Sequence, residues 1–321
     1  MFLTEMNKHA VPSFKHSLPN KLDLITAAFD DALLRSLKTL SAPSISLCWL
    51  SKAVEFLAVA HAEARRLIFS SLEVTVLDDA LASYLDDSVK LLDICNSVSA
   101  EIERLRQRRI VLALAVHLLG DGKVRRAREA LTEGEEARRA ASGFGKANNA
   151  EALVKDLALA LLRSAPPRGK ISKVARVVRR TVYAVGLVTV FVAGALVSAM
   201  EGTPETVTVR APAEFSWAES LNELTTAVSG ELKRRFGKEE RTKGLLLEEV
   251  DDVATRVGEA CEIAEEDTER KERLNDVVKE VERAMGSFSD GLEGLSKGMN
   301  VMFHGVLSNR NFMLNHVRVK A

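Results

Sequence analysis

The sequence predicts an all-α protein built as an elongated multi-helix bundle. Aromatic residues make up only 5% of the chain, and alanine, leucine, valine, glutamate and arginine dominate, a composition that favours helices over a β sandwich. Near the C-terminus, apolar residues recur at alternating spacings of four and three over about sixty residues. One uncharged stretch, Thr181–Met200, is long enough to form a helix that is apolar on every side.

Prolines, glycines and charge divide the chain into six regions. The first residues contain Pro12 and Pro19 and no continuous apolar run, so we interpret them as a disordered tail in preference to a plastid transit peptide. The six expected regions are a tail at 1–19, an N-terminal helical region at 20–163, a Pro-Pro break with a basic lead at 164–180, the apolar helix at 181–200, a linker at 201–213 and heptad-patterned helices at 214–321.

Two helices are expected first, over residues 21–40 and 46–71. Asn20 is a suitable N-cap for the first, and Pro43 requires that helix to end before it. His61 lies near the apolar stripe of the second helix. We interpret it as a packed residue at the edge of the core rather than a ligand, because no other histidine has a metal-ligand spacing to it.

A long helix is expected over Leu81–Leu119. Asp86 and Asp87 superficially resemble a catalytic carboxylate pair, but adjacent residues on a helix diverge by about 100°. The spacing from Asp86 to Lys90 instead predicts an ion pair one turn apart. The Asp86–Asp87 doublet is therefore not a candidate active site.

Residues 101–109 form a basic cluster inside that helix. A solvated helix face is the plain interpretation, and an acidic partner inside or outside the chain is the functional one. Nucleic acid is disfavoured because no aromatic side chains are interleaved for base stacking. Beyond a glycine turn, the pattern predicts a charged helix at 123–141, a loop at 141–149 and a short helix at 151–162.

The apolar segment itself has two interpretations. As a helix it is about 30 Å long, close to the thickness of a bilayer core. Acidic residues follow it at Glu201 and Glu205. Basic residues precede it at Arg168, Lys170, Lys173, Arg176, Arg179 and Arg180. Basic residues before the segment and acidic residues after it are typical of a single membrane-spanning helix whose N-terminal side is cytosolic. A helix at the centre of a soluble bundle has the same apolar character.

Charge is balanced overall but segregated locally. Residues 101–180 carry 19 lysines and arginines against 9 acids, whereas residues 201–290 carry 13 against 23. If the apolar segment crossed a bilayer, these two blocks would lie on opposite sides of it. If it lies in a protein core, they can pack side by side, with a modest electrostatic gain at exposed positions.

The C-terminal region carries the most regular pattern, a heptad repeat broken only at Asp267 and Lys271. It predicts a long apolar seam, interpreted as an intramolecular bundle seam in preference to an intermolecular coiled coil; the break is either a polar layer that sets register or a bend. The seam runs through Leu246, Val250, Val253, Val257, Ala260, Ala264, Asp267, Lys271, Leu274, Val278, Val281, Met285, Phe288, Leu292, Leu295, Met299, Met302 and Val306.

Candidate chemistry is absent from the sequence. Cys48, Cys95 and Cys261 are far apart and odd in number, which indicates reduced thiols rather than a disulfide framework. We therefore predict no catalytic, cofactor-binding or metal-binding residues, no cofactor, and a protein that is not an enzyme. The pattern leaves the oligomeric state open.

Two stretches carry a family resemblance. The run Tyr84–Asn96, with the sequence YLDDSVKLLDICN, resembles the signature stretch of the BYPASS/ROH family of plant proteins, and Leu47–Leu50, with the sequence LCWL, is similar to a second family stretch. The resemblance implies a non-enzymatic regulatory protein with one membrane-spanning helix. It further implies a link to a root-derived signal that restrains shoot growth, or binding to a subunit of the exocyst tethering complex.

These observations predict a regulatory adaptor that acts through protein–protein contacts at a membrane, with its N-terminal half in the cytosol. The alternative is a soluble, cytoplasmic helical scaffold with residues 181–200 in its core. The part of the chain after Met200 has no N-x-[ST] sequon, which weakly favours the second interpretation.

Overall fold

The computed structural model describes residues 21–40, 44–71, 79–144, 150–164, 172–203, 209–237, 247–266 and 271–318. Every regular element within these ranges is helical, which confirms the all-α prediction. The predicted tail at 1–19 lies outside the described residues. The elements are α1 (Lys21–Lys38), α2 (Leu47–Arg65), the π-helix η1 (Arg66–Ser71), α3 (Asp79–Gly120), α4 (Val124–Phe144), α5 (Ala150–Arg163), α6 (Lys173–Glu201), α7 (Ala218–Gly237), α8 (Glu248–Glu266) and α9 (Lys271–Arg318).

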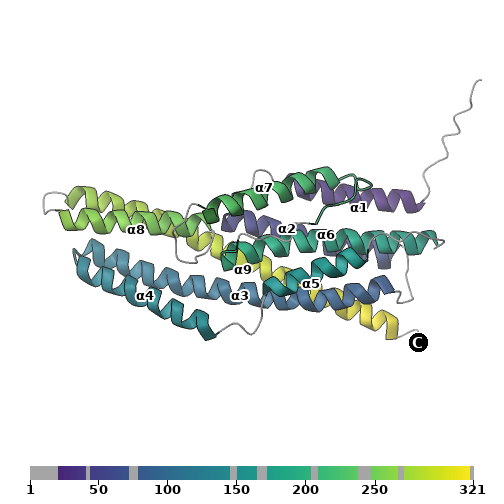
Figure 1. The fold of residues 1–321 in the computed structure, drawn as a ribbon, viewed down its shortest axis with the longest axis horizontal. Helices are drawn as coiled ribbons and strands as arrows, with labels where there is room; N and C mark the ends of the chain where they lie inside the picture. The colour runs from purple at the N-terminus through teal and green to yellow at the C-terminus, as the bar shows by residue number, and fades with distance from the viewer. Residues whose placement is uncertain are drawn as a thin grey trace, which may run out of the picture.

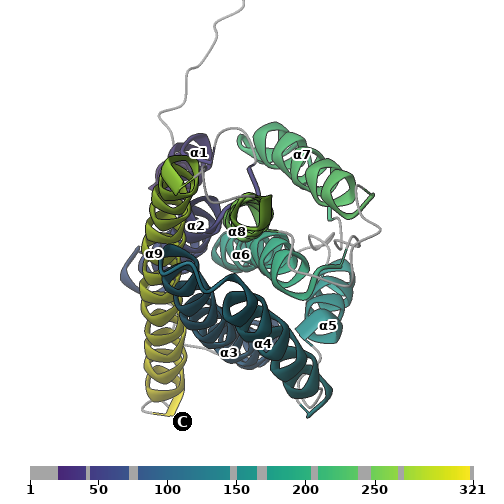
Figure 2. The same cartoon turned by 90° about the vertical axis from the view of Figure 1, so that its left-hand side faces the viewer.

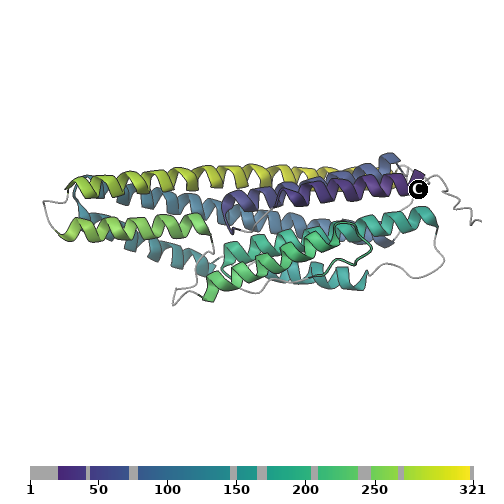
Figure 3. The same cartoon turned by 90° about the horizontal axis from the view of Figure 1, so that it is seen from above.

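The molecule is an elongated bundle organised along two long helices. α3 has 42 residues and α9 has 48, and both run along most of the length of the bundle (Figures 1 and 3). α9 packs against α2, α3 and α8, so the C-terminal helix contacts elements from both halves of the chain. The N-terminal and C-terminal regions therefore share one structure.

The apolar segment lies within α6, which is the central helix of the wider half of the bundle. α2, α3 and α5 pack against it, with smaller contributions from α1 and α7 (Figure 2). Within the described residues it is the one helix whose length and composition would allow it to cross a membrane, and 89% of its most apolar window is buried inside the protein. All residues from Leu187 to Met200 are buried.

The ends of α6 are defined by local chemistry. The Ser172 hydroxyl accepts a hydrogen bond from the Ala175 backbone N–H, as an N-cap does. Gly202 ends the helix in the left-handed conformation at φ 67°, which glycine adopts at little cost. α6 thus begins eight residues before the uncharged stretch, because the basic lead from Lys173 to Arg180 is helical as well.

The heptad-patterned region forms two helices, α8 and α9. α8 ends at Glu266 and α9 begins at Lys271, and the two pack against each other as a hairpin (Figure 3). The predicted break thus falls between these two antiparallel helices. Asp267 lies outside the described residues, and Lys271 is the first residue of α9. The apolar positions on both sides are mostly buried, as at Val253, Val257, Val281, Phe288, Leu295 and Met302, against other helices of the same chain.

Two helix boundaries differ from those expected. The helix predicted over residues 46–71 ends as an α-helix at Arg65 and continues as the π-helix η1. The loop predicted at 141–149 begins later, because α4 extends to Phe144; residues 145–149 lie outside the described ranges. Both differences arise at helix ends, where sequence patterns are least decisive.

A glycine allows α2 and α9 to approach closely. A Cβ atom added to Gly291 would lie 2.8 Å from Leu47 Cβ, whereas one added to Gly286 on the same helix would meet nothing within 4 Å. We expect Gly291→Val to lower the free energy of unfolding by about 1–3 kcal/mol, because it forces α9 away from α2. Urea denaturation beside the control Gly286→Val measures the effect; equal losses in the two variants would show that close packing at Gly291 is not required.

Candidate functional site

A charged contact fixes the start of α6 against α1. Arg180, the last residue of the basic lead, donates from Nη1 and Nη2 to the two carboxylate oxygens of Asp30 at 3.0 and 2.7 Å. The Asp30 side chain is 10% exposed and the Arg180 side chain 20%, so both charges are largely removed from water. A bidentate pair in this setting specifies geometry as well as attraction.

The chain that follows α6 completes the same contact. Trp217 Nε1 donates to Asp30 Oδ1 at 3.1 Å, and the Arg180 guanidinium lies 4.4 Å from the centre of the Phe215 ring. Phe215 also stacks on Tyr183 of α6, with the ring centres 6.3 Å apart. Residues immediately before and well after the apolar segment therefore meet at one point, which we call the α6 clamp (Asp30, Arg180, Phe215 and Trp217).

A second polar group lies deep between α2, α3 and α6. His61 Nδ1 is 2.7 Å from Tyr84 Oη, and His61 Nε2 is 3.3 Å from Thr189 Oγ1. The Thr189 hydroxyl donates to the Val185 carbonyl at 2.8 Å, so it accepts from His61. This assigns the proton to Nε2, and Nδ1 accepts from the Tyr84 hydroxyl.

Side chains of α9 close this polar core from the other side. Asn309 donates to the His61 carbonyl and accepts from Arg65, at 3.3 Å in each case. Arg310 donates to the Ser88 hydroxyl at 3.2 Å and to the Leu85 carbonyl. The polar core (His61, Tyr84, Ser88, Thr189, Asn309 and Arg310) therefore connects α2, α3, α6 and α9.

Burial keeps the polar core uncharged at His61 and Tyr84. Desolvation lowers the pKa of His61 from 6.5 to about 4, and it raises the pKa of Tyr84 well above its usual 10. The cavity beside these groups has a volume of about 30 Å³, the space of a single water molecule rather than of a substrate. The arrangement is suited to holding four helices in register.

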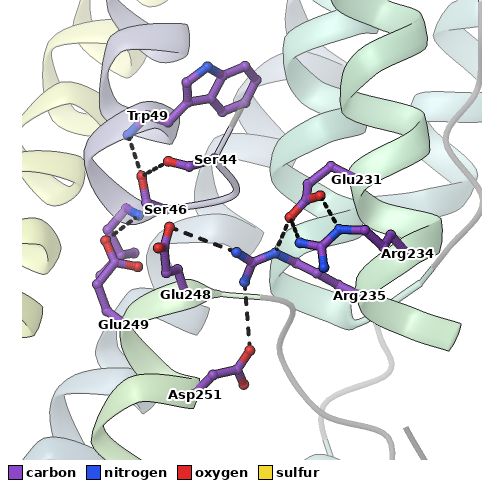
Figure 4. A network of polar contacts seen from close by, with 10 residues as sticks. Ser44, Ser46, Trp49, Glu231, Arg234, Arg235, Glu248, Glu249 and Asp251 are labelled. Atoms are coloured by element: carbon purple, nitrogen blue, oxygen red, sulfur yellow. Dashed lines mark hydrogen bonds and ion pairs between the residues drawn. The ribbon is translucent and has the colours of Figure 1, made fainter. Parts of the chain in front are cut away.

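A third polar group joins α2, α7 and α8 (Figure 4). Arg235 contacts Glu231 at 2.8 Å, Asp251 at 3.6 Å and Glu248 at 3.8 Å, which links the end of α7 to the start of α8. The Arg234 and Arg235 guanidinium groups lower the pKa of Glu231 to about 2. Glu249 accepts from the Leu47 backbone N–H at 2.8 Å and so caps α2 from another helix.

Several charged residues singled out from the sequence form ion pairs within the chain. Lys90 forms its ion pair with Asp87, at 3.3 Å, and not with Asp86 as expected, because a spacing of three residues also brings side chains together on a helix. In the basic cluster, Arg104 pairs with Glu101, Arg106 with Glu103 and Arg108 with Glu135. Its acidic partners thus include residues of the same chain.

Several structurally important residues were not foreseen, among them Asp30, Thr189, Trp217 and Asn309. Asp30 has a recognisable signal, since it lies three and seven residues before Leu33 and Leu37 and so falls on the buried face of α1. Among the described residues, no group of three or more histidine, cysteine, aspartate or glutamate side chains is arranged to hold a metal ion. Cys48 is exposed, and Cys95 and Cys261 are buried.

The fold and these three polar groups define a helical-bundle protein whose charged and polar side chains serve its own packing. A family model described as "Protein ROH1-like" matches residues 4–158 and 141–317. The chain therefore belongs to the ROH1-like family. No solved structure matches it.

Curated plant proteins are similar to this chain. "UPF0496 protein 4" of Oryza sativa subsp. japonica is 33% identical over 254 residues, which cover 75% of this chain and 55% of that protein. "Protein BPS1, chloroplastic" of Arabidopsis thaliana is 28% identical over 85% of this chain and 77% of that protein. "Protein ROH1D" of the same plant is 24% identical over 98% of this chain and 90% of that protein. The chain spans about half the length of the rice relative. These relationships confirm the BYPASS/ROH resemblance and are consistent with a non-enzymatic regulatory role.

Proposed function

We propose that the protein is a non-enzymatic regulatory scaffold of the cytoplasm, which acts through contacts of its outer surface with another protein, and that α6 is its core rather than a membrane anchor. The observation that carries the proposal is the α6 clamp. Arg180 precedes the apolar segment, Phe215 follows it, and the Arg180 guanidinium carbon lies 4.4 Å from the centre of the Phe215 ring. Residues on opposite sides of a bilayer would be separated by about 30 Å.

The packing around α6 supports the same conclusion. α2 and α3 come from the chain before the segment and α7 from the chain after it, and all of them contact α6. His61 and Thr189 place a hydrogen bond between α2 and the middle of α6. To enter a bilayer, α6 would have to exchange each of these contacts for lipid, including the ion pair of Arg180 with Asp30.

Two cysteine substitutions at either end of α6 distinguish a core from an anchor. Lys173 and Ser216 are both exposed, and the background Cys48→Ala with Cys261→Ala removes two of the three native thiols. The buried Cys95 stays unreactive, because burial raises its pKa to about 12. The full chain is synthesised in the presence of microsomes and treated with a membrane-impermeant maleimide.

For a core helix, we expect the protein to remain in the supernatant after alkaline carbonate extraction, with Lys173→Cys and Ser216→Cys labelled to the same extent before and after detergent is added. A carbonate-resistant pellet in which only one of the two positions is labelled before detergent would contradict the proposal.

The membrane adaptor is the second candidate function, because α6 has the length and composition to cross a bilayer. The same labelling experiment decides between the two. By the family resemblance, an exocyst subunit is the first protein partner to test, and the readout is co-purification from a detergent-free extract. Absence of any complex with the purified subunit would rule out that partner. The scaffold proposal would still be tested by the carbonate extraction and the cysteine labelling.

A further inference from the structure

A cavity of about 590 Å³ lies between α3, α4 and α8, and its described lining residues include no member of the three polar groups described above. Here α3 and α4 form one helical hairpin and α8 with the start of α9 forms another, and both hairpins turn at the same end of the molecule (Figure 1). In the view from that end, the helices α4 and α8 are seen apart from each other (Figure 2). The cavity lies between α8 on one side and the α3–α4 pair on the other.

Small side chains keep this space open on the α8 side. Ala254, Gly258 and Cys261 line the cavity, and a Cβ atom added to Gly258 would meet nothing within 4 Å. On the opposite side, a Cβ atom at Gly134 would lie 2.6 Å from Val111, so α4 approaches α3 closely there. The cavity therefore arises because α8 lies farther from α3 and α4 than these two helices lie from each other. Loose packing between α3 and α4 is not its cause.

The lining combines apolar walls with a few polar groups. Val111, Leu112, Leu131 and Val257 supply apolar surface, and Ile110, another lining residue, is 55% exposed. The size and this composition are those of sites that bind small organic molecules. The polar lining groups are Arg104, Gln107, Arg108 and Glu135.

The charges in the lining favour an anion. Among the described residues, two guanidinium groups and one carboxylate line the cavity. Arg108 is paired with Glu135 at 3.2 Å, and Arg104 is paired with Glu101 of its own helix. These pairs are partly exposed, with side-chain exposures of 24–42%, so a ligand can replace them at modest cost. We propose that the cavity binds an apolar carboxylic acid of drug-like size, with its apolar body against Val111 and Val257 and its carboxylate on Arg104 and Arg108.

Binding of cis-parinaric acid, a fluorescent long-chain acid, to the purified full chain tests this proposal, with its methyl ester as the neutral counterpart. We expect saturable binding of the acid with one site per chain and a Kd of about 10 µM, and binding of the ester at least about tenfold weaker. Lack of saturable binding of the acid, or equal affinities for acid and ester, would overturn the proposal.

A pair of glycine variants tests whether the ligand occupies this cavity. Gly258→Phe fills the cavity and is expected to weaken binding of the acid by more than about tenfold, whereas Gly230→Phe, the same change at an open position on α7, leaves it unchanged. Ala254→Leu is a second filling variant in case Gly258→Phe lowers the yield of folded protein, which far-ultraviolet circular dichroism monitors. Undiminished binding in a folded filling variant would place the ligand elsewhere and contradict the proposal.

A pair of variants at neighbouring arginines tests whether the carboxylate of the ligand binds Arg108. Arg108→Gln is expected to reduce the preference for acid over ester to near unity, whereas Arg109→Gln preserves it, because Arg109 does not line the cavity and donates to Ser289 of α9 instead. Loss of the preference in both variants, or in neither, would overturn the role of Arg108. These outcomes are independent of the fractionation result, so this inference and the proposed function can fail separately.

Discussion

Replacing Asp30 with alanine is expected to lower the free energy of unfolding by about 3 kcal/mol, because it leaves the largely buried Arg180 guanidinium without its counter-charge. Trp217 Nε1, which is hydrogen-bonded to Asp30, also loses its acceptor. The effect is measured by urea denaturation of the full chain, followed by circular dichroism. The neighbouring Asp31 is exposed, so Asp31→Ala is the matched control and should change stability by less than about 0.5 kcal/mol.

A double-mutant cycle separates the ion pair from the rest of the clamp. If the loss arises from the stranded charge, Asp30→Ala combined with Arg180→Met should be less destabilising than the sum of the single changes. Strict additivity of the two changes would show that Asp30 and Arg180 do not stabilise each other, and the clamp would then lose its principal support.

Acidification from pH 7 to pH 5 is expected to remove about 2 kcal/mol of stability through His61 alone. Burial lowers the pKa of His61 from 6.5 to about 4, so the unfolded chain binds a proton at this residue in a pH range where the folded chain does not. The stability contributed by the neutral imidazole is therefore fully present above pH 6.5. It is lost as the pH falls from 6.5 towards 4.

The measurement is the difference in unfolding free energy between the original chain and His61→Gln, followed from pH 7 to pH 5. Glutamine keeps a donor and an acceptor for Thr189 and Tyr84 but does not titrate. Burial also raises the pKa of Asp87, Glu201 and Glu249, and these carboxyl groups act in the opposite direction, but they are common to both proteins and cancel in the difference. Parallel stability curves for the two proteins would show that His61 is not the titrating group.

Most of the helices were predictable because their sequences carry an apolar stripe with helical period. The stripe at Leu33 and Leu37 is buried in α1, and the seam from Val281 to Val306 is buried in α9. The reversal between α8 and α9 was not predicted as such. A heptad pattern continues in register across residues 267–270, and periodicity reports which face is buried without reporting whether the chain turns.

The clamp and the polar core were less accessible to sequence reasoning, because they depend on contacts between distant residues. Asp30 and Trp217 are 187 residues apart, and His61 and Thr189 are 128 apart. The spacing of residues within one helix does not predict contacts between residues so far apart in the sequence. Hydropathy favoured a membrane-spanning Thr181–Met200 with a core helix as the alternative. The contact between Arg180 before the segment and Phe215 after it, on which our core proposal rests, is visible only in three dimensions.

Synthesis from the N-terminus delivers the main packing partners of α6 before α6 itself. Its main neighbours α2, α3 and α5 all precede it in the chain, so α6 can be covered as soon as it emerges. α9 contacts α2 across 244 residues and closes the bundle last. At about 5–20 residues per second, synthesis of the residues after α6 takes several seconds. If α6 is a core helix, as we propose, its early partners cover it during that interval. For a core helix, this order of synthesis provides a protein surface onto which α6 folds while the rest of the chain is still being made.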